Sequence, residues 1–178
     1  QMTGQLCRPR HIHRLDEDTT GPVLFAKTEW AQVRLDAFMR DKRIERTYVA
    51  FVQGVLKSAS GRIEAPIGRD RHHATRRRVS PTGEPAATRY ERLDSFRHAS
   101  LVRLQLETGR THQIRVHMSH LGHPLLGDVL YGGPREGIGR QALHGERLRF
   151  LQPFTEEVIE VEAPWPDDLK ALQARLKK

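Results

Sequence analysis

The stretch Thr108-Gly109-Arg110-Thr111-His112-Gln113-Ile114-Arg115-Val116-His117 runs on to Gly122-His123-Pro124-Leu125-Leu126-Gly127-Asp128 and is dense in charged, imidazole and glycine residues. A second stretch of the same character, His13-Arg14-Leu15-Asp16-Glu17-Asp18-Thr19-Thr20-Gly21, stands nearer the N-terminus. Charged side chains are rarely fully buried unless they are paired. Neither stretch is therefore typical of core packing, and both are expected to contribute to a functional site.

Together the two stretches closely resemble motifs of the RluA-type RNA pseudouridine synthases. The segment from Arg46 to Gly54 resembles the tyrosine-bearing strand of that family, and Gln141–His144 with Leu148–Phe150 resembles its closing segment. These blocks follow one another in the family's order and cover nearly the whole chain. The resemblance implies an enzyme that isomerises specific uridines in ribosomal or transfer RNA to pseudouridine, without a cofactor.

The resemblance also implies roles for individual residues. Asp16 stands at the position of the catalytic aspartate, and Tyr48 at that of the active-site tyrosine. Arg115 matches the arginine that pairs with the aspartate, and a cation close to a desolvated carboxylate keeps it ionised. Thr20 stands where serine is usual, so a hydroxyl is kept. The sequence does not choose between Asp16 as a nucleophile and Asp16 as a base on the ribose.

Apolar periodicity and turn residues predict the order of secondary structure. Strands are expected over 22–27, 47–52, 100–107 and 156–162, and helices over 29–40, over 111–121 with Ile114, Met118 and Leu121 on one face, and after Pro166. Two further strand-like segments, 63–68 and 87–93, flank an arginine-rich loop. This order predicts an α+β fold with a mixed, mainly antiparallel sheet, flanking helices and a central catalytic cleft.

A single catalytic domain is expected over residues 1–178, because domains typically run to about 100–150 residues. Relatives usually carry an additional strand and an Asn-Lys-Pro-Ala-Gly-like loop before the aspartate motif. Only residues 1–12 precede that motif here. The N-terminal strand region is therefore expected to be short or missing.

The chain is strongly basic, with a net charge of +8 and a pI near 10.2, which favours a polyanionic partner such as RNA. Arginine binds phosphate through a bidentate fork. The arginines of the loop between the two strand-like segments are therefore expected to clamp the RNA backbone: Arg69, Arg71, Arg76, Arg77 and Arg78. The alternative is a solvated hairpin without such a role.

Three further residues are expected to bind RNA. Arg14 is next to the predicted catalytic aspartate, where it can enter the gap left by a flipped uridine or hold a phosphate. Arg110 and His112 stand at the start of the predicted helix, where free backbone N–H groups also favour an anion. Replacing Arg14 or Arg110 by alanine is expected to change RNA affinity or turnover.

Two other functional classes share some of these sequence features. His112, His117, His120 and His123 raise the possibility of a metallohydrolase, but they lack a convincing carboxylate or cysteine complement, so no metal is expected. A non-catalytic RNA-binding or assembly module with the same fold is the stronger alternative. The single cysteine, Cys7, excludes an internal disulfide, and no apolar run approaches the roughly 20 residues of a membrane span. A cytoplasmic monomer without an obligatory protein partner is expected.

Overall fold

The computed structural model describes residues 8–178, so Cys7 lies outside the described residues. Its centre is a 6-stranded sheet in the order β10-β9-β3-β8-β7-β4, and every neighbouring pair is antiparallel. These strands are β3 (Glu45–Gln53), β4 (Ser60–Glu64), β7 (Ala87–Ser95), β8 (Ala99–Leu106), β9 (Leu143–Leu151) and β10 (Val158–Glu162). The predicted α+β class and mainly antiparallel sheet are confirmed.

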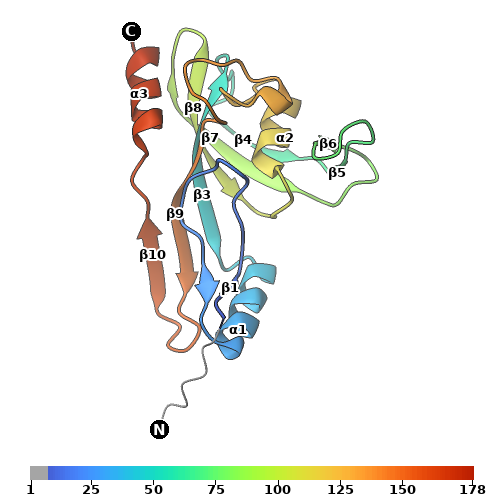
Figure 1. Ribbon diagram of the computed structural model, residues 1–178, viewed down its shortest axis with the longest axis vertical. Coiled ribbons are helices and arrows are strands. Elements are labelled where there is room, and N and C mark those ends of the chain that lie inside the picture. The colour runs from blue at the N-terminus through green and yellow to red at the C-terminus, as the bar shows by residue number, and fades with distance from the viewer. Residues whose placement is uncertain (1–7) are drawn as a thin grey trace.

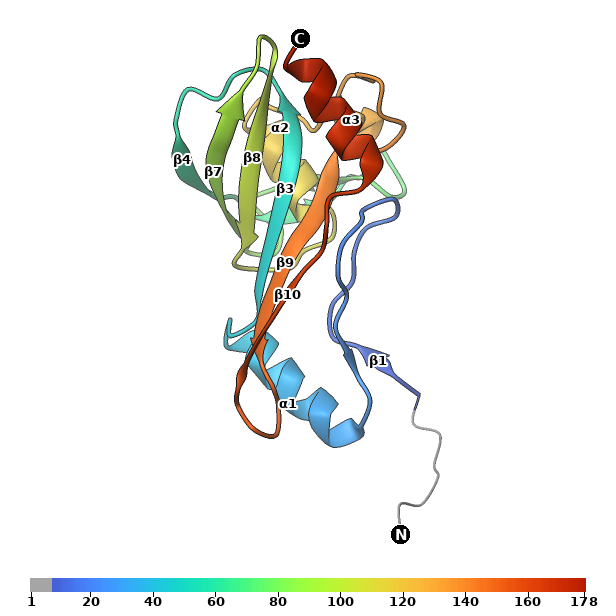
Figure 2. The same cartoon turned by 90° about the vertical axis from the view of Figure 1, so that its left-hand side faces the viewer.

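Strand β3 is buried on both faces, because a helix covers each side of the sheet. Figure 2 shows α2 (Gln113–His120) behind the sheet and α3 (Asp167–Leu176) in front of it. Alternate side chains of β3 enter the two resulting cores: Tyr48 packs with Ile114 and Met118 of α2, whereas Phe51 packs with Leu169 of α3. The period-2 alternation of the strand thus assigns Tyr48 to the α2 side.

A smaller lobe lies at the end of the molecule opposite α2 and α3 (Figure 1). Helix α1 (Glu29–Arg40) begins at Thr28, whose hydroxyl accepts a hydrogen bond from the backbone N–H of Ala31 at 3.1 Å. Its Leu35 and Phe38 pack with Ile44, which directly precedes β3, and with Leu148 of β9. Strands β1 (Arg10–His11) and β2 (Phe25–Ala26) pair beside it. The long strands of the main sheet therefore connect the two lobes.

The ends of several elements were predicted wrongly. The strand expected over 22–27 is ordered only as β2, because its partner β1 offers two residues. The helix expected from 111 begins at Gln113, since His112 has a left-handed backbone with φ of 57°. Leu121 is 40% exposed and does not continue the apolar face of that helix. The remaining expected helices agree closely with α1 and α3.

The arginine-rich loop is the tip of a hairpin formed by β5 (Ile67–Arg69) and β6 (Arg77–Val79). It projects from the α2 side of the sheet in Figure 1. A short 3-10 helix, η1 (Val129–Tyr131), follows α2 and lies near the base of this hairpin. Within residues 8–178, no helix is both long and apolar enough to cross a membrane.

Candidate active site

A cleft of about 410 Å³ lies on the α2 side of the sheet, between the two lobes. Its walls bring together residues from both sequence stretches and from β3. Those predicted from sequence are Arg14, Asp16, Tyr48, Arg110 and His112. Arg115 is buried and is not part of the cleft wall, but its Nη1 lies 3.8 Å from Oδ2 of Asp16. The structure therefore gathers the three predicted catalytic residues at one place.

Asp16 is held by a loop that is fastened to the start of β9. The hydroxyl of Thr20 is 2.8 Å from Nδ1 of His144, whose Nε2 donates to the carbonyl of Ala163, so Nδ1 accepts from the threonine. Gly21 has φ of 135°, and a Cβ there would lie 2.7 Å from the Cα of Gly145. A hydroxyl and a glycine are therefore both needed where this loop touches β9.

Tyr48 presents its ring to the cleft from the middle of β3. Burial raises the pKa of its phenol, the charge of Arg46 opposes that change, and the charge of Asp16 adds to it. The phenol therefore stays protonated at neutral pH. A protonated phenol with an apolar ring can stack on a base and donate or accept one hydrogen bond.

Arg115 is bound chiefly by a carboxylate that the sequence analysis did not assign. Its Nε and Nη2 donate to the two oxygens of Asp128 at 2.7 and 2.8 Å. Arg115 is 7% exposed and Asp128 1%, so this bidentate pair is buried. Burial opposes the charge of Arg115, but the hydrogen bonds and charge of Asp128 raise its pKa. The remaining nitrogen, Nη1, is 3.8 Å from Oδ2 of Asp16.

This geometry aims one end of the guanidinium at Asp16. Arg115 and Asp16 lie close together, as expected, but their contact of 3.8 Å is longer than those between Arg115 and Asp128. Asp128 belongs to the quoted stretch that ends in Gly127-Asp128, yet nothing in the sequence marked it as a partner of Arg115. Its position directly before η1 brings it back to α2.

Tyr131 connects the predicted site residues to the arginine hairpin. The ring of Tyr131 lies under the guanidinium of Arg115, with 5.0 Å between the guanidinium carbon and the ring centroid. The Tyr131 hydroxyl lies 2.8 Å from Nδ1 of His112 and accepts a hydrogen bond from the backbone N–H of Arg77 at 2.9 Å. Burial lowers the pKa of His112. Tyr131 was not predicted from the sequence, because no pattern at this position distinguishes it.

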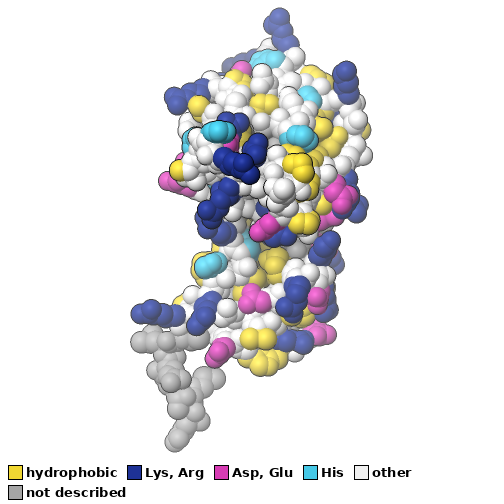
Figure 3. All heavy atoms as spheres, turned by 90° about the vertical axis from the view of Figure 1, so that its right-hand side faces the viewer, with side chains coloured by type: hydrophobic (Ala, Val, Ile, Leu, Met, Phe, Trp, Pro, Cys, Tyr) yellow, Lys and Arg dark blue, Asp and Glu magenta, His cyan; other side chains and the backbone are white. Residues whose placement is uncertain are grey.

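The five hairpin arginines are not equivalent. Arg69, Arg71 and Arg78 are exposed, whereas Arg77 is half-buried and fixed at the hairpin base. Arg76 has Nε 3.7 Å from a carboxylate oxygen of Asp70. Figure 3 shows Lys and Arg side chains gathered on the face from which this hairpin projects. The hairpin thus presents positive charge beside the cleft.

Arg14 and Arg110, which were also predicted to bind RNA, differ in whether a carboxylate pairs with them. Arg14 is exposed at the cleft and has no ion pair within residues 8–178. Arg110 is bound by Glu84 at 2.7 Å and donates to the carbonyl of Pro85 at 3.0 Å. A phosphate at Arg110 would therefore compete with Glu84.

The histidines of the metal alternative point to separate partners. His117 is fully buried between the hydroxyl of Thr88 and the carbonyl of Ala65. His123 contacts the carbonyl of Gln53 instead. No group of three or more His, Cys, Asp or Glu side chains among residues 8–178 is arranged to hold a metal ion.

The sequence model of the RNA pseudouridylate synthase family matches residues 3–120. An uncharacterized RNA pseudouridine synthase of Bacillus subtilis is 51% identical over 174 residues, which are 97% of this chain and 58% of that protein. Ribosomal large subunit pseudouridine synthase D of Vibrio parahaemolyticus is 46% identical over 181 residues, covering 94% of this chain and 55% of that protein. The chain thus spans somewhat more than half the length of these relatives.

The fold is also similar to a solved structure. The human protein named RNA pseudouridylate synthase domain containing 1 superposes with a TM-score of 0.80 at 31% identity, over 93% of this chain and 73% of the human one. The sequence match, the fold and the cleft that carries Asp16 agree. This chain belongs to the RNA pseudouridylate synthase family.

Proposed function

We propose that this chain converts uridine in RNA to pseudouridine, with Asp16 as the catalytic carboxylate. The observation that supports it most is the convergence of Asp16, Tyr48 and Arg115 at one cleft. Ribosomal RNA is the first substrate class to test, since one relative is named a ribosomal large subunit pseudouridine synthase. A cytoplasmic location, a monomeric state and one catalytic domain over residues 1–178 stay predictions.

The reaction breaks the bond between ribose C1′ and uracil N1 and forms one between C1′ and C5. The proton on C5 is lost and N1 gains one, so no electrons are exchanged with a cofactor. Asp16 acts as an ionised carboxylate at the ribose, either as a nucleophile at C1′ or as a base on the sugar. Both routes need its charge, which Nη1 of Arg115 faces at 3.8 Å.

Tyr48 is proposed to hold the uracil while the base is detached and turned. Its ring lines the cleft, and its buried phenol remains neutral. The flipped uridine loses its stacking in the RNA, a cost of a few kcal/mol that stacking and phosphate contacts offset. Arg14 and the hairpin arginines are proposed to supply phosphate contacts.

The test is release of tritium from RNA labelled at uracil C5. Asp16→Asn is expected to abolish release, because the amide carries no charge and is a poor nucleophile and base. Asp18→Asn is the matched control: Asp18 is exposed, is absent from the cleft wall, and has φ of 64°, which asparagine tolerates. Its release should equal that of the wild type.

Two outcomes would contradict the proposal. Equal release by wild type and Asp16→Asn would remove Asp16 from the chemistry. Salt-sensitive RNA binding without release from ribosomal or transfer RNA would instead favour a non-catalytic RNA-binding module.

A further inference from the structure

Arg46 is a buried cation in the cleft wall, and no carboxylate among residues 8–178 pairs with it. It is 9% exposed, and its hydrogen bond among residues 8–178 runs from Nη2 to the carbonyl of Thr108 at 3.3 Å. Its Nε is buried without a partner in the described chain. A guanidinium has five N–H donors. Most of the hydrogen-bonding capacity of Arg46 is therefore unused.

The carboxylates near Arg46 are bound by other arginines. Glu107, which lines the same cleft, is held by Arg62 at 2.9 Å and by Arg89 at 2.6 Å. Glu45, the preceding residue in β3, faces Arg149 at 2.9 Å. Exposed arginines on this side are thus neutralised, whereas no counter-charge in the described part of the chain pairs with the buried Arg46.

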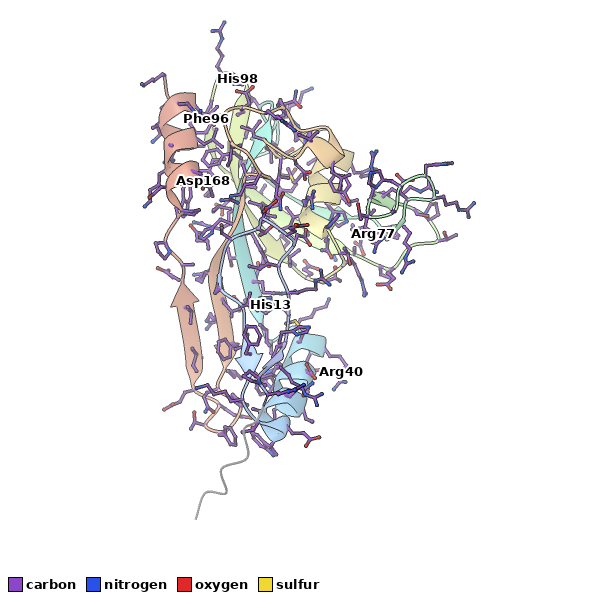
Figure 4. All side chains as sticks on the ribbon, viewed as in Figure 1. His13, Arg40, Arg77, Phe96, His98 and Asp168 are labelled. Carbon is purple, nitrogen blue, oxygen red and sulfur yellow. The ribbon has the colours of Figure 1, made fainter. Side chains whose placement is uncertain are left out.

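The surroundings of Arg46 preserve its positive charge rather than compensate it. His13, which has 7% exposure, is kept neutral: burial and then the charge of Arg46 lower its pKa to about 4. Figure 4 labels His13 in the middle of the molecule, between the lobe of α1 and that of α2. Burial also lowers the pKa of Arg46, as expected for a desolvated cation. An isolated charge in such a place is costly unless an opposite charge joins it.

Gly109 leaves space beside the guanidinium. A Cβ at Gly109 would lie 2.9 Å from Nη1 of Arg46, closer than ordinary van der Waals contact. Gly109 is exposed at the rim of the cleft, and Arg46 lines the cleft next to it. The absence of a side chain at residue 109 therefore keeps Nη1 approachable from the cleft.

We propose that Arg46 binds a non-bridging phosphate oxygen of the RNA strand at the target uridine, so that its counter-charge arrives with the substrate. The nature of this ligand rests on the proposed function. Arg46 and Tyr48 are two residues apart on β3 and so face the same side of the sheet. A uridine stacked on Tyr48 with its ribose at Asp16 carries its backbone along this wall.

A phosphate suits Arg46 better than a uracil carbonyl does. A carbonyl oxygen is neutral and would leave the buried charge uncompensated. A phosphodiester is anionic and offers two oxygens, which match the donors of a guanidinium fork. Arg46 differs in this respect from Arg14 and from the hairpin arginines other than Arg77, which are exposed to solvent.

The test compares Arg46→Gln with Arg97→Gln in binding to a fluorescein-labelled oligouridylate. Arg97 is an exposed arginine in the turn between β7 and β8, and no ion pair within residues 8–178 includes it. Losing one phosphate contact lowers the slope of log K against log salt by about 0.7 for a single strand. We expect this flattening and a roughly tenfold weaker affinity for Arg46→Gln. Arg97→Gln should change neither.

Thermal unfolding without RNA separates this role from a structural one. Arg46→Gln should unfold at the same or a higher temperature, because it removes an uncompensated buried charge. Arg46→Lys, which keeps the charge, should retain the wild-type salt slope. A lower unfolding temperature for Arg46→Gln with an unchanged salt slope would overturn the proposal and make Arg46 a structural residue.

The second binding experiment uses a methylphosphonate oligouridylate, whose backbone is uncharged. Wild type and Arg46→Gln should bind this probe equally if the contact is to a phosphate charge. Unequal binding would instead place a neutral group of the nucleotide at Arg46 and refute the proposal.

Turnover distinguishes failure of this inference from failure of the proposed function. If the wild type releases tritium from RNA, Arg46→Gln should raise KM about tenfold with kcat nearly unchanged, as loss of uniform binding does. An unchanged KM would refute the role of Arg46 and leave the isomerase proposal intact. If the wild type releases no tritium but the salt slope depends on Arg46, the anion site stands and the isomerase proposal fails.

Discussion

Replacing Asp128 by asparagine keeps the shape of the side chain but removes the charge that faces Arg115. The amide offers one oxygen where the carboxylate offered two, and its NH2 group would oppose a guanidinium N–H. Both partners are buried, at 7% and 1% exposure. The substitution therefore leaves a buried cation partly unpaired and frees Nη1 from its present aim at Asp16.

The size of the effect follows from burial. Removing one partner of a buried ion pair costs about 3–5 kcal/mol, and each kcal/mol lowers Tm by roughly 2–4 °C in a domain of this size. We expect Asp128→Asn to lower Tm by roughly 6–20 °C. A misplaced catalytic group can cost about 100-fold in rate, so kcat should fall by roughly 10- to 100-fold.

The matched control is Asp168→Asn in α3. Asp168 holds Arg140 at 2.7 and 3.0 Å, nearly the distances of the Asp128 pair, but its side chain is 42% exposed. Arg140 is 14% exposed and also donates to the backbone carbonyls of Gln141 and Leu143, so losing this half-exposed pair should cost less than losing a pair that is buried on both sides. Calorimetry of both variants thus isolates the contribution of burial. If Asp128→Asn lowers Tm no more than Asp168→Asn, the reasoning from burial is wrong.

A double variant separates stability from chemistry. Arg115→Met with Asp128→Leu replaces the buried pair by apolar side chains, which is often neutral for stability. We expect Tm to return toward the wild type while tritium release stays lost. Recovery of release would show that Arg115 has no part in the reaction.

Thr20→Val leaves Nδ1 of His144 buried without a donor, so it should lower the unfolding free energy, measured by urea denaturation, by about 1–3 kcal/mol. Thr20→Ser keeps the hydroxyl and should not lower it. Equal effects of the two substitutions would contradict this prediction. Gly21→Ala places a Cβ 2.7 Å from the Cα of Gly145, so we expect lower stability and weaker tritium release, and unchanged values would refute the close approach. Burial lowers the pKa of His13 from 6.5 to about 4, so on acidification the unfolded chain takes up the proton at a higher pH than the folded chain does. The unfolding free energy should therefore fall by up to about 3 kcal/mol as the pH drops from 6.5 to about 4. His13→Gln should flatten this pH dependence in thermal unfolding, and an unchanged profile would count against it.

The sequence predicted the helices, the sheet class and the residues gathered at the cleft, because periodicity and motif order carry that information. It did not predict the partner of Arg115. Asp128 follows a glycine in a segment without periodicity, and only the turn between α2 and η1 brings it to the guanidinium. Pairing across such a turn depends on three-dimensional geometry rather than spacing.

Arg46 was missed for a different reason. In sequence it is one polar position of a β-strand, where an arginine ordinarily reaches solvent. Its burial and the engagement of Glu107 by Arg62 and Arg89 emerge only from strand register. The start of α2 likewise depends on Gln113, whose side-chain oxygen accepts from the backbone N–H of Arg110 at 2.9 Å.

The strand order β10-β9-β3-β8-β7-β4 has a consequence for the timing of folding. Strand β3 lies between β8 and β9, so its partners are synthesised long after it, and pairings distant in sequence form slowly. The Asp16 loop is fastened to His144 and Gly145 at the start of β9. On a translating ribosome the loop therefore lacks its contacts to Arg140, Gln141 and His144 until the segment that leads into β9 has emerged, and the carboxylate of Asp16 is among the last groups to reach its place.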